Sequence, residues 1–244
     1  MRLGATLAYL SDAPPLDTAA WARRLVDSGF ESLWVPNIVG RGYFVPDPFV
    51  TLAVAASVTS DVEIGTATLQ LPLYHPADLV HRIESLRAVC GGRLTLGVSP
   101  GSTATDYETL DRDYASRFAV FHDRVAGLRE SLGQLPPMLL GSWGANVERA
   151  AREFDGWLAS GYRTAPEQIL TAHERFRAAG GRRAIVCAVP VRTVEDLGPT
   201  ATALRAYEQA GFDDAVMLFF PDGPSPEDVR ALLPAEGPRK PCPF

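Results

Sequence analysis

The sequence predicts a single parallel (β/α)8 barrel, a TIM barrel, formed as one domain by residues 1–233. The chain has 244 residues, close to the length of about 250 that is typical of this fold. Eight segments of strand character alternate with eight segments of helical periodicity, as in a closed parallel barrel. An open doubly wound sheet is the alternative. Residues 11–15, which follow the first strand, contain two prolines and cannot form the glycine-rich loop of that fold.

Short apolar segments bounded by turn residues predict the strands. Most are continuous apolar runs, which suits strands that are buried on both faces of a parallel sheet. The third strand is different, because small hydroxyl-bearing residues replace bulky ones after its start. In chain order the predicted strands occupy residues 3–9, 31–36, the first part of 63–76, 93–99, 138–141, 156–160, 183–190 and 215–220.

Longer segments with apolar residues at helical spacing predict the helices. The first brings Trp21, Leu25 and Val26 close to one face, and Gly29 ends it. The second is apolar, and the fourth is long and amphipathic. In chain order the predicted helices occupy residues 16–28, 48–60, 76–89, 114–132, 145–154, 166–179, 199–209 and 225–233. The proline-rich remainder, residues 234–244, is predicted to be a disordered tail.

Composition excludes several classes of function. The net charge of −6, without a basic stripe, argues against a nucleic-acid partner. The chain contains no run of about 18 apolar residues, so no membrane span is predicted. No signal peptide is visible, so a cytoplasmic location is expected. The cysteines Cys90, Cys187 and Cys242 form no CxxC pair, which argues against a zinc site or a disulfide framework. Lys240 is the only lysine, so a Schiff-base lysine inside the barrel is excluded.

The third strand carries the first candidate site. Thr66 and Thr68 alternate with Ala67 and Leu69, so the two hydroxyls are expected on the same side of the strand. Small polar residues on the inner face of a core strand leave room for a ligand. The alternative is that each threonine packs as a valine would, because threonine is an ordinary strand residue.

The ends of the barrel strands supply further candidates, because the active site of this fold lies there. Ser99 and Gly101 follow the fourth strand, and Ser160 ends the sixth. The fifth strand leads into a helix through residues 141–146, which combine two glycines with a serine. The start of a helix exposes N–H groups that bind phosphate. Capping of that helix by Ser142 or Asn146 is the alternative.

The remaining polar residues offer less chemistry. His75 lies between Tyr74 and Pro76 and either fixes a turn or serves as a polar group of the site. His81, His122 and His173 lie on predicted helices and are expected to be surface or packing residues. The acidic loop after the fourth strand contains no histidine or cysteine and is expected to be solvated, so no metal site is predicted. That loop contains Asp106, Glu108, Asp111 and Asp113.

Three stretches resemble the luciferase-like flavin-dependent monooxygenases, whose fold is the barrel of bacterial luciferase. The first is residues 65–76, Gly-Thr-Ala-Thr-Leu-Gln-Leu-Pro-Leu-Tyr-His-Pro. The second is residues 91–101, Gly-Gly-Arg-Leu-Thr-Leu-Gly-Val-Ser-Pro-Gly, with Arg117 further on. The third runs from Leu139-Leu140-Gly141-Ser142 through Glu148-Arg149-Ala150-Ala151 to Asp155-Gly156-Trp157. Order and spacing agree from about residue 3 to residue 220.

The resemblance implies a flavin whose ring lies across the mouth of the barrel. It places a cis peptide bond at Ala67-Thr68, beneath the ring, and puts Thr68 and Ser99 near the ring or the ribityl chain. It puts the flavin phosphate at the loop already described as an anion site. The residues assigned to the cofactor are Thr66, Ala67, Thr68, Ser99, Gly101, Ser142, Trp143, Gly144, Asn146 and Ser160.

The sequence departs from the family at three places. The family commonly offers histidine or glutamate at the end of the second strand, where this chain has Asn37. An amide hydrogen-bonds but does not act as an acid or base at neutral pH. In luciferase an arginine after the fourth strand helps to hold the phosphate, and Pro100 stands there instead. Two segments that relatives often enlarge, residues 133–136 and 191–198, are short, and the second is where relatives carry a lid.

The resemblance therefore implies a flavin-dependent oxidoreductase. The leading hypothesis is a two-component monooxygenase that uses reduced FMN from a separate reductase, and O2, to oxidise a small organic substrate, with Asn37 and His75 as polar groups near the ring. Because relatives are often dimers, a homodimer is expected. The rivals are hydride transfer with a deazaflavin coenzyme, a non-catalytic flavin-binding protein, and a flavin-free barrel in which Thr66 and Thr68 merely pack.

Overall fold

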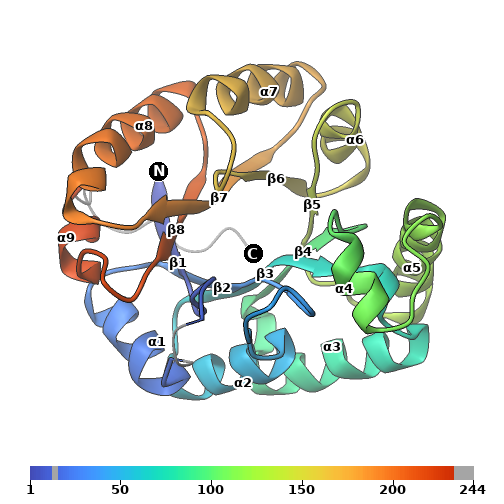
Figure 1. Ribbon diagram of the computed structural model, residues 1–244. Coiled ribbons are helices and arrows are strands. Elements are labelled where there is room, and N and C mark those ends of the chain that lie inside the picture. The colour runs from blue at the N-terminus through green and yellow to red at the C-terminus, as the bar shows by residue number, and fades with distance from the viewer. Residues whose placement is uncertain (13–15, 234–244) are drawn as a thin grey trace.

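A computed structural model describes residues 1–12 and 16–233 of the chain. The described residues form a closed barrel of parallel strands that neighbour one another in the order β1 to β8, with the helices outside (Figure 1). The predicted fold class is confirmed. The predicted tail, 234–244, lies outside the described residues. Within the described part, no helix is long and apolar enough to span a bilayer.

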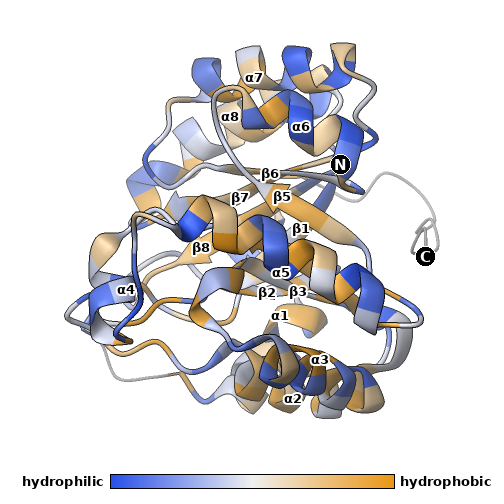
Figure 2. Cartoon of the chain, turned by 90° about the vertical axis from the view of Figure 1, so that its right-hand side faces the viewer, coloured by the Kyte–Doolittle hydropathy of each residue, from blue (hydrophilic) through white to orange (hydrophobic). Residues whose placement is uncertain are grey.

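The observed strands begin or end within a few residues of the predicted bounds. They are β1 Arg2–Thr6, β2 Ser32–Val35, β3 Glu63–Gln70, β4 Leu94–Ser99, β5 Met138–Gly141, β6 Gly156–Ser160, β7 Arg183–Val191 and β8 Asp214–Phe219. Figure 2 shows several of these strands in hydrophobic colours between helices of mixed colour. This pattern is the one expected for a sheet that is covered by helices on one face and closed on itself at the other.

The helices alternate with the strands, and three short 3₁₀ turns accompany them. The helices are α1 Thr18–Asp27, α2 Pro48–Val58, α3 Pro76–Cys90, α4 Ala104–Thr109, α5 Arg117–Ser131, α6 Asn146–Glu153, α7 Pro166–Ala178, α8 Leu197–Ala210 and α9 Pro226–Arg230. The turns are η1 Leu71–Leu73, η2 Gly91–Arg93 and η3 Val194–Asp196. Local capping fixes several helix starts: the Asp17 side chain accepts from Ala20 N, and Asp47 accepts from Phe49 N and Val50 N.

The middle of the barrel is filled by Trp34, which glycines on neighbouring strands accommodate. A Cβ atom on Gly65 would lie 2.3 Å from Trp34 Cζ3, and one on Gly4 would lie 3.1 Å from Trp34 Nε1. The indole is fully buried and donates to Ser32 Oγ at 2.8 Å. Gly65 is therefore required by close packing against the indole, whereas a Cβ on Gly4 would first meet Ser32 Oγ, at 2.3 Å.

Charged side chains close the amino-terminal end of the barrel. Glu63 on β3 accepts from both terminal nitrogens of Arg183 on β7, at 2.8 Å each. Arg183 also donates to Asp214 on β8 at 3.0 Å, and Arg2 on β1 pairs with both carboxylates. Buried charges are tolerated when they are paired in this way. Side chains thus fill the amino-terminal half of the barrel, and space remains at the carboxyl ends of the strands.

The segment between β4 and α5 differs most from the prediction. It contains the additional helix α4, and its Asp106 is fully buried instead of solvated. Asp106 accepts from Arg41 Nη2 at 2.5 Å, from Gln70 Nε2 at 2.8 Å and from Val39 N at 3.2 Å. The expectation of a solvated loop is wrong at this residue, because its basic partner lies on a distant loop. Long-range pairing of this kind leaves no local signal in the sequence.

Candidate functional site

A cavity of about 470 Å³ opens at the carboxyl ends of the strands. Its volume lies within the range of small-molecule sites, and its position is where this fold places its active sites. Most of the residues predicted for the cofactor and the reaction line it. Those residues are Asn37, Ala67, Thr68, Ser99, Gly101, Ser142, Trp143, Asn146 and Ser160.

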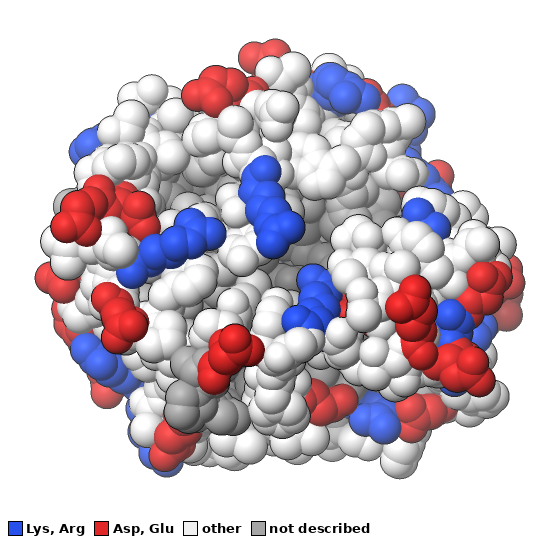
Figure 3. Space-filling view, viewed as in Figure 1, with Lys and Arg blue, Asp and Glu red and all other residues white. Residues whose placement is uncertain are grey.

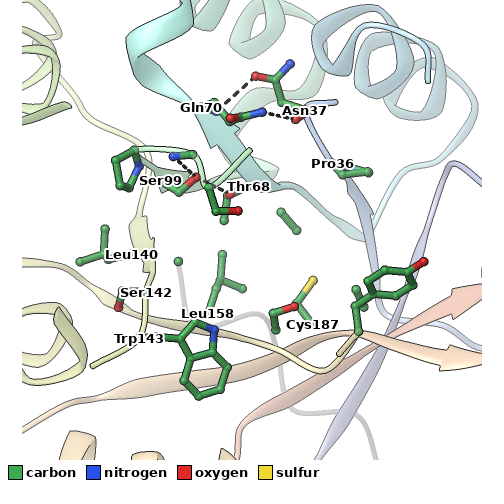
Figure 4. A pocket seen from close by; sticks show the side chains of 18 of the residues that line it. Pro36, Asn37, Thr68, Gln70, Ser99, Leu140, Ser142, Trp143, Leu158 and Cys187 are labelled. Carbon is green, nitrogen blue, oxygen red and sulfur yellow. Dashed lines mark hydrogen bonds between the residues drawn. The ribbon is translucent and has the colours of Figure 1, made fainter. Parts of the chain in front are cut away.

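The floor of the cavity includes the Ala67–Thr68 peptide bond of β3. This bond is cis, so the prediction of a cis peptide at that position is confirmed. The hydroxyls of Thr68 and Ser99 lie 2.7 Å apart and share a hydrogen bond, with Thr68 on β3 and Ser99 at the end of β4 (Figure 4). Ser99 Oγ also accepts from Gly101 N at 3.3 Å. A connected pair of hydroxyls therefore lies at one side of the floor.

Thr66 and Thr68 do not share one environment. Thr66 is fully buried, its hydroxyl donates to Gly97 O at 2.8 Å, and it is not among the residues that line the cavity. The register of β3 against β4 shifts between Thr66 and Leu69, where β3 holds one extra residue. Such a bulge interrupts the alternation of side chains. The simple packing interpretation thus describes Thr66, whereas Thr68 faces the cavity.

The rest of the floor is apolar. Leu158 on β6, Cys187 on β7 and Leu218 on β8 lie opposite β3, and Figure 4 shows Leu158 and Cys187 on the side of the cavity away from Thr68. Burial raises the pKa of the Cys187 thiol to about 12. The thiol is therefore neutral at physiological pH and contributes apolar surface. Cys187 was not a sequence candidate, because nothing marks a lone cysteine in an apolar strand.

The loop from β5 to α6 forms one end of the cavity. Neither Ser142 nor Asn146 caps α6, whose N-cap residue is Ala145 and has no side-chain cap. Instead, Ser142 Oγ donates to Asn146 O at 3.0 Å, and Ser142 O accepts from Trp157 Nε1 at 3.0 Å. Trp143 packs edge-on against Trp157 and stays 38% exposed at the rim. The capping alternative is therefore wrong, and the start of α6 keeps its positive pole toward the cavity.

Three basic side chains stand beside this loop. The guanidinium carbon of Arg117, on α5, lies 3.8 Å from the ring centroid of Tyr114 and 4.3 Å from that of Phe118. The Nε atom of Arg117 is buried and has no partner within the described residues. Arg149 on α6 hydrogen-bonds His122 on α5, and all three basic residues line the cavity. We refer to Arg117, His122 and Arg149 as the basic wall.

The basic wall was not predicted as a unit from the sequence. His122 was expected on the surface, and it is exposed, but it also faces the cavity. Arg117 and Arg149 appeared only as parts of the family stretches. The sequence does place both arginines near the start of a helix, because Arg149 lies one turn into α6 and Arg117 begins α5. Their convergence depends on how α5 and α6 pack.

Asn37 lines the cavity from the end of β2, but its polar atoms are largely occupied. Its Oδ1 accepts from Gln70 N at 3.2 Å, and its carbonyl accepts from Gln70 Nε2 at 2.8 Å (Figure 4). Its amide also hydrogen-bonds the Tyr74 side chain, whose pKa burial raises strongly. These contacts hold the amide in a fixed orientation at the wall.

Two other predicted residues lie apart from the cavity. His75 is exposed at the N-cap of α3, which follows the turn η1, and it does not line the cavity. Gly144 has a φ of +64° and serves the turn into α6 without lining the cavity. The structure does not bring His75 together with Asn37 and the floor residues.

The described residues hold no cluster of three or more metal-binding side chains. The chemistry available at the site is therefore that of hydroxyls, amides, guanidinium groups and apolar surface. Such a set binds and orients a ligand.

Comparison with known proteins gives a family and a fold. The family model for luciferase-like monooxygenases matches residues 2–196. The chain is 36% identical over 101 residues to 4-hydroxyprotoasukamycin monooxygenase from Streptomyces nodosus subsp. asukaensis, a match that covers 41% of this chain and 26% of that protein. It is 28% identical over 123 residues to the F420-dependent glucose-6-phosphate dehydrogenase of Amycolatopsis mediterranei, covering 48% of this chain and 36% of that one. Both matches span much less than the full length of those relatives.

Solved structures extend the likeness in fold over nearly the whole chain. The monooxygenase RslO1 from Streptomyces bottropensis superposes with a TM-score of 0.76 at 16% identity, covering 95% of this chain and 96% of that one. An F420-dependent secondary alcohol dehydrogenase gives 0.75 at 16% identity, covering 96% and 98%. The barrel, the matched stretches and the family model agree, and the chain belongs to the luciferase-like monooxygenase family of oxidoreductases, which includes members dependent on FMN and members dependent on the deazaflavin coenzyme F420.

Proposed function

We propose that this protein is a flavin-dependent oxidoreductase, namely the oxygenase of a two-component monooxygenase that uses reduced FMN and O2 on a small organic substrate. The observation that carries the proposal is the polarity of the cavity. An apolar floor with two hydroxyls at one side leads to a basic wall and a helix start at one end. A flavin mononucleotide has the same order of parts, a flat apolar ring, a hydroxylated chain and a phosphate.

The residues present fit that cofactor. The phosphate would be held by the basic wall together with Ser142, Trp143 and Asn146, because guanidinium groups and helix N-termini favour a dianion. The buried Nε of Arg117, which has no partner in the described chain, is a donor that a phosphate oxygen would satisfy. Thr68 and Ser99 would contact the ring or the ribityl chain, over the Ala67–Thr68 peptide.

The cofactor, when bound, supplies the redox chemistry, and the chain's own residues position it. Leu158, Cys187 and Leu218 exclude water from the floor. Asn37 orients a ligand through hydrogen bonds and transfers no proton, since its amide is neutral at physiological pH. The separate reductase and the homodimer belong to this proposal as partners.

A deazaflavin coenzyme that transfers a hydride is the second candidate. Proteins named as F420-dependent are among the matched relatives and solved structures, which supports this candidate. A flavin-binding protein without turnover is the third, and the amide of Asn37 where relatives carry an acid or base supports it. Its cavity would bind FMN in the same way.

Titration with reduced FMN and with the deazaflavin coenzyme, followed by measurement of oxygen uptake, tests the proposal. Binding of FMN at micromolar concentration with substrate-dependent oxygen uptake is the expected result. Tight binding of the deazaflavin alone would favour the second candidate, and binding of FMN without oxygen uptake over a substrate panel would favour the third. Binding of neither compound would refute all three.

The phosphate assignment has its own test. Arg149→Gln should weaken the binding of FMN about tenfold, and the binding of riboflavin hardly at all, because only FMN carries the phosphate. Arg152→Gln removes an exposed arginine from the same helix and is the matched control. Equal losses for FMN and riboflavin would place the phosphate elsewhere.

A further inference from the structure

Among the described residues, basic side chains line the cavity, and acidic side chains do not. The basic residues are Arg41, Arg117, Arg149 and His122. The chain as a whole carries a net charge of −6, so this bias is local. The basic wall accounts for three of the four. Arg41 lies on the loop between β2 and α2, across the barrel from α6 (Figure 1).

Arg41 is held in a fixed orientation. Its Nε lies 3.0 and 3.1 Å from the two carboxylate oxygens of Asp106, and its Nη2 lies 2.5 Å from Oδ2. Asp106 is fully buried and is held in turn by Gln70 and Val39. The Nη1 atom of Arg41 makes no hydrogen bond within the described residues, and the side chain is 29% exposed. A preorganised donor therefore remains available at the cavity.

Two further guanidinium groups lie beside Tyr162, and neither is among the residues that line the cavity. Tyr162, in the loop after β6, lines the cavity, and the Cζ atoms of Arg163 and Arg192 lie 5.3 and 5.7 Å from its ring centroid. Within the ranges that the structure describes, no carboxylate pairs with either side chain. Burial raises the pKa of the neighbouring Tyr43, and Arg41 and Arg163 act against that shift, which places both groups within electrostatic reach of it.

The surface view agrees with this arrangement. Figure 3 shows Lys and Arg side chains around the central hollow of this face, while Asp and Glu side chains lie mostly toward its periphery. A cleft lined by one sign of charge raises the local concentration of the opposite ion. The body of this end of the cavity is apolar and is formed by Leu10, Pro36 and Ile38.

We propose that the end of the cavity between Arg41 and Tyr162 binds the anionic group of the substrate, which is an organic acid with an apolar or aromatic body. Arg41 receives the carboxylate through Nη1, Arg163 and Arg192 supply unpaired positive charge, and the apolar residues contact the body. The assignment rests on the proposed function, which gives the opposite end of the cavity to the cofactor. It makes Arg41 a specificity-determining residue.

Benzoate and benzamide are suitable probes, because they share a shape and differ in charge. Their dissociation constants are measured by ligand-observed NMR, both in the flavin-free protein and in the protein saturated with FMN. Benzoate should bind roughly fivefold more tightly than benzamide in both states, a preference of the size expected for partly exposed charge pairs. Added salt should reduce the preference.

Arg41→Gln should abolish the preference for benzoate and leave benzamide unchanged. Because Arg41 also anchors Asp106, the double variant Arg163→Gln/Arg192→Gln provides a second test that breaks no ion pair, and it should reduce the preference by about half on a logarithmic scale. Arg205→Gln, at an exposed site on α8, is the control for loss of one charge and should preserve the preference.

Equal affinity for the two probes, no binding of benzoate, or a preference that survives in both variants would overturn the proposal. A preference removed by Arg149→Gln instead would place the anion at the basic wall and would also overturn it. Failure of the proposed function would be distinguishable from failure of the anion site. It would appear as a lack of flavin binding, while the preference for benzoate in the flavin-free protein would still be measured.

Discussion

At the scale of single residues, the interior of the barrel depends on where side chains are missing. Gly65 leaves the space that Trp34 occupies. Gly97 leaves space for Leu158 in the same way, because a Cβ atom added to Gly97 would lie 2.3 Å from Leu158 Cδ1. The cavity above exists because Trp34 and Leu158 fill the layer beneath it. The same small residues therefore determine both the packing of the middle barrel and the depth of the site.

Substitution of Gly65 by alanine tests this dependence. The added methyl group would collide with the Trp34 ring, whose nearest atoms lie 2.3 and 2.4 Å away. The free energy of unfolding should fall by about 1 to 3 kcal/mol, as measured by denaturant titration. Gly133→Ala is the control, since a Cβ there would meet nothing within 4 Å. Similar stability of the two variants would contradict the packing argument.

At the scale of elements, helix α7 is tied to the start of β8 through a buried histidine. Arg177 Nε donates to His173 Nε2 at 3.1 Å, and the His173 ring stacks on Phe212 at a centroid distance of 4.1 Å. Burial, with a further contribution from Arg177, lowers the pKa of His173 to about 4. The imidazole is therefore neutral in the folded protein at physiological pH.

This pKa gives a pH dependence of stability with a definite sign. In the unfolded chain the histidine titrates near its ordinary pKa of about 6.5. The folded state thus binds fewer protons than the unfolded state between about pH 6.5 and 4. His173 therefore does not change the stability above about pH 6.5, and the free energy of unfolding decreases by about 3 kcal/mol as the pH falls to 4 and below.

Denaturant titrations at several pH values measure this slope. His173→Gln should flatten it between pH 6.5 and 4, whereas His81→Gln, at an exposed site on α3, should leave it unchanged. An unchanged slope in the His173 variant would assign the acid sensitivity to other groups.

Elements whose signals are local were predicted well from the sequence. The bounds of β5 and β6 agree with the prediction, and the cis peptide was inferred from the family stretch on β3. The helix α4 was missed, because its six residues are too short for a periodic signal. The same limit applies to the site. Thr68 lies near the end of β3, Ser99 ends β4 and Ser142 follows β5, so strand ends drew attention to all three. Arg41, Arg117 and Arg149 converge only through tertiary packing.

At the scale of the whole molecule, the buried charges at the amino-terminal end link strands from across the barrel. Glu63 on β3 meets Arg183 on β7, and Thr95 on β4 donates to Glu63 at 2.6 Å. Arginine contacts and hydrogen bonds hold the pKa of Glu63 below its usual range despite its burial. These contacts connect opposite sides of the closed sheet, so their loss should affect the whole fold.

Glu63→Gln should lower the free energy of unfolding by about 3 to 5 kcal/mol, because it leaves the buried Arg183 with a weaker set of partners. Glu227→Gln removes a carboxylate from an exposed pair with Arg24 and should cost about 1 kcal/mol or less. Denaturant titration of both variants provides the comparison. Equal costs would show that the buried network contributes no more than a surface pair.

The closed amino-terminal half of the barrel also determines how ligands reach the cavity. Because Trp34 and the paired charges fill the barrel beneath it, the described cavity is closed at its base and opens on the face shown in Figure 3. Under the proposed function, the cofactor and the substrate would both enter and leave through this face. Binding in a fixed order, with the cofactor on the floor first and the substrate after it, is the expected consequence.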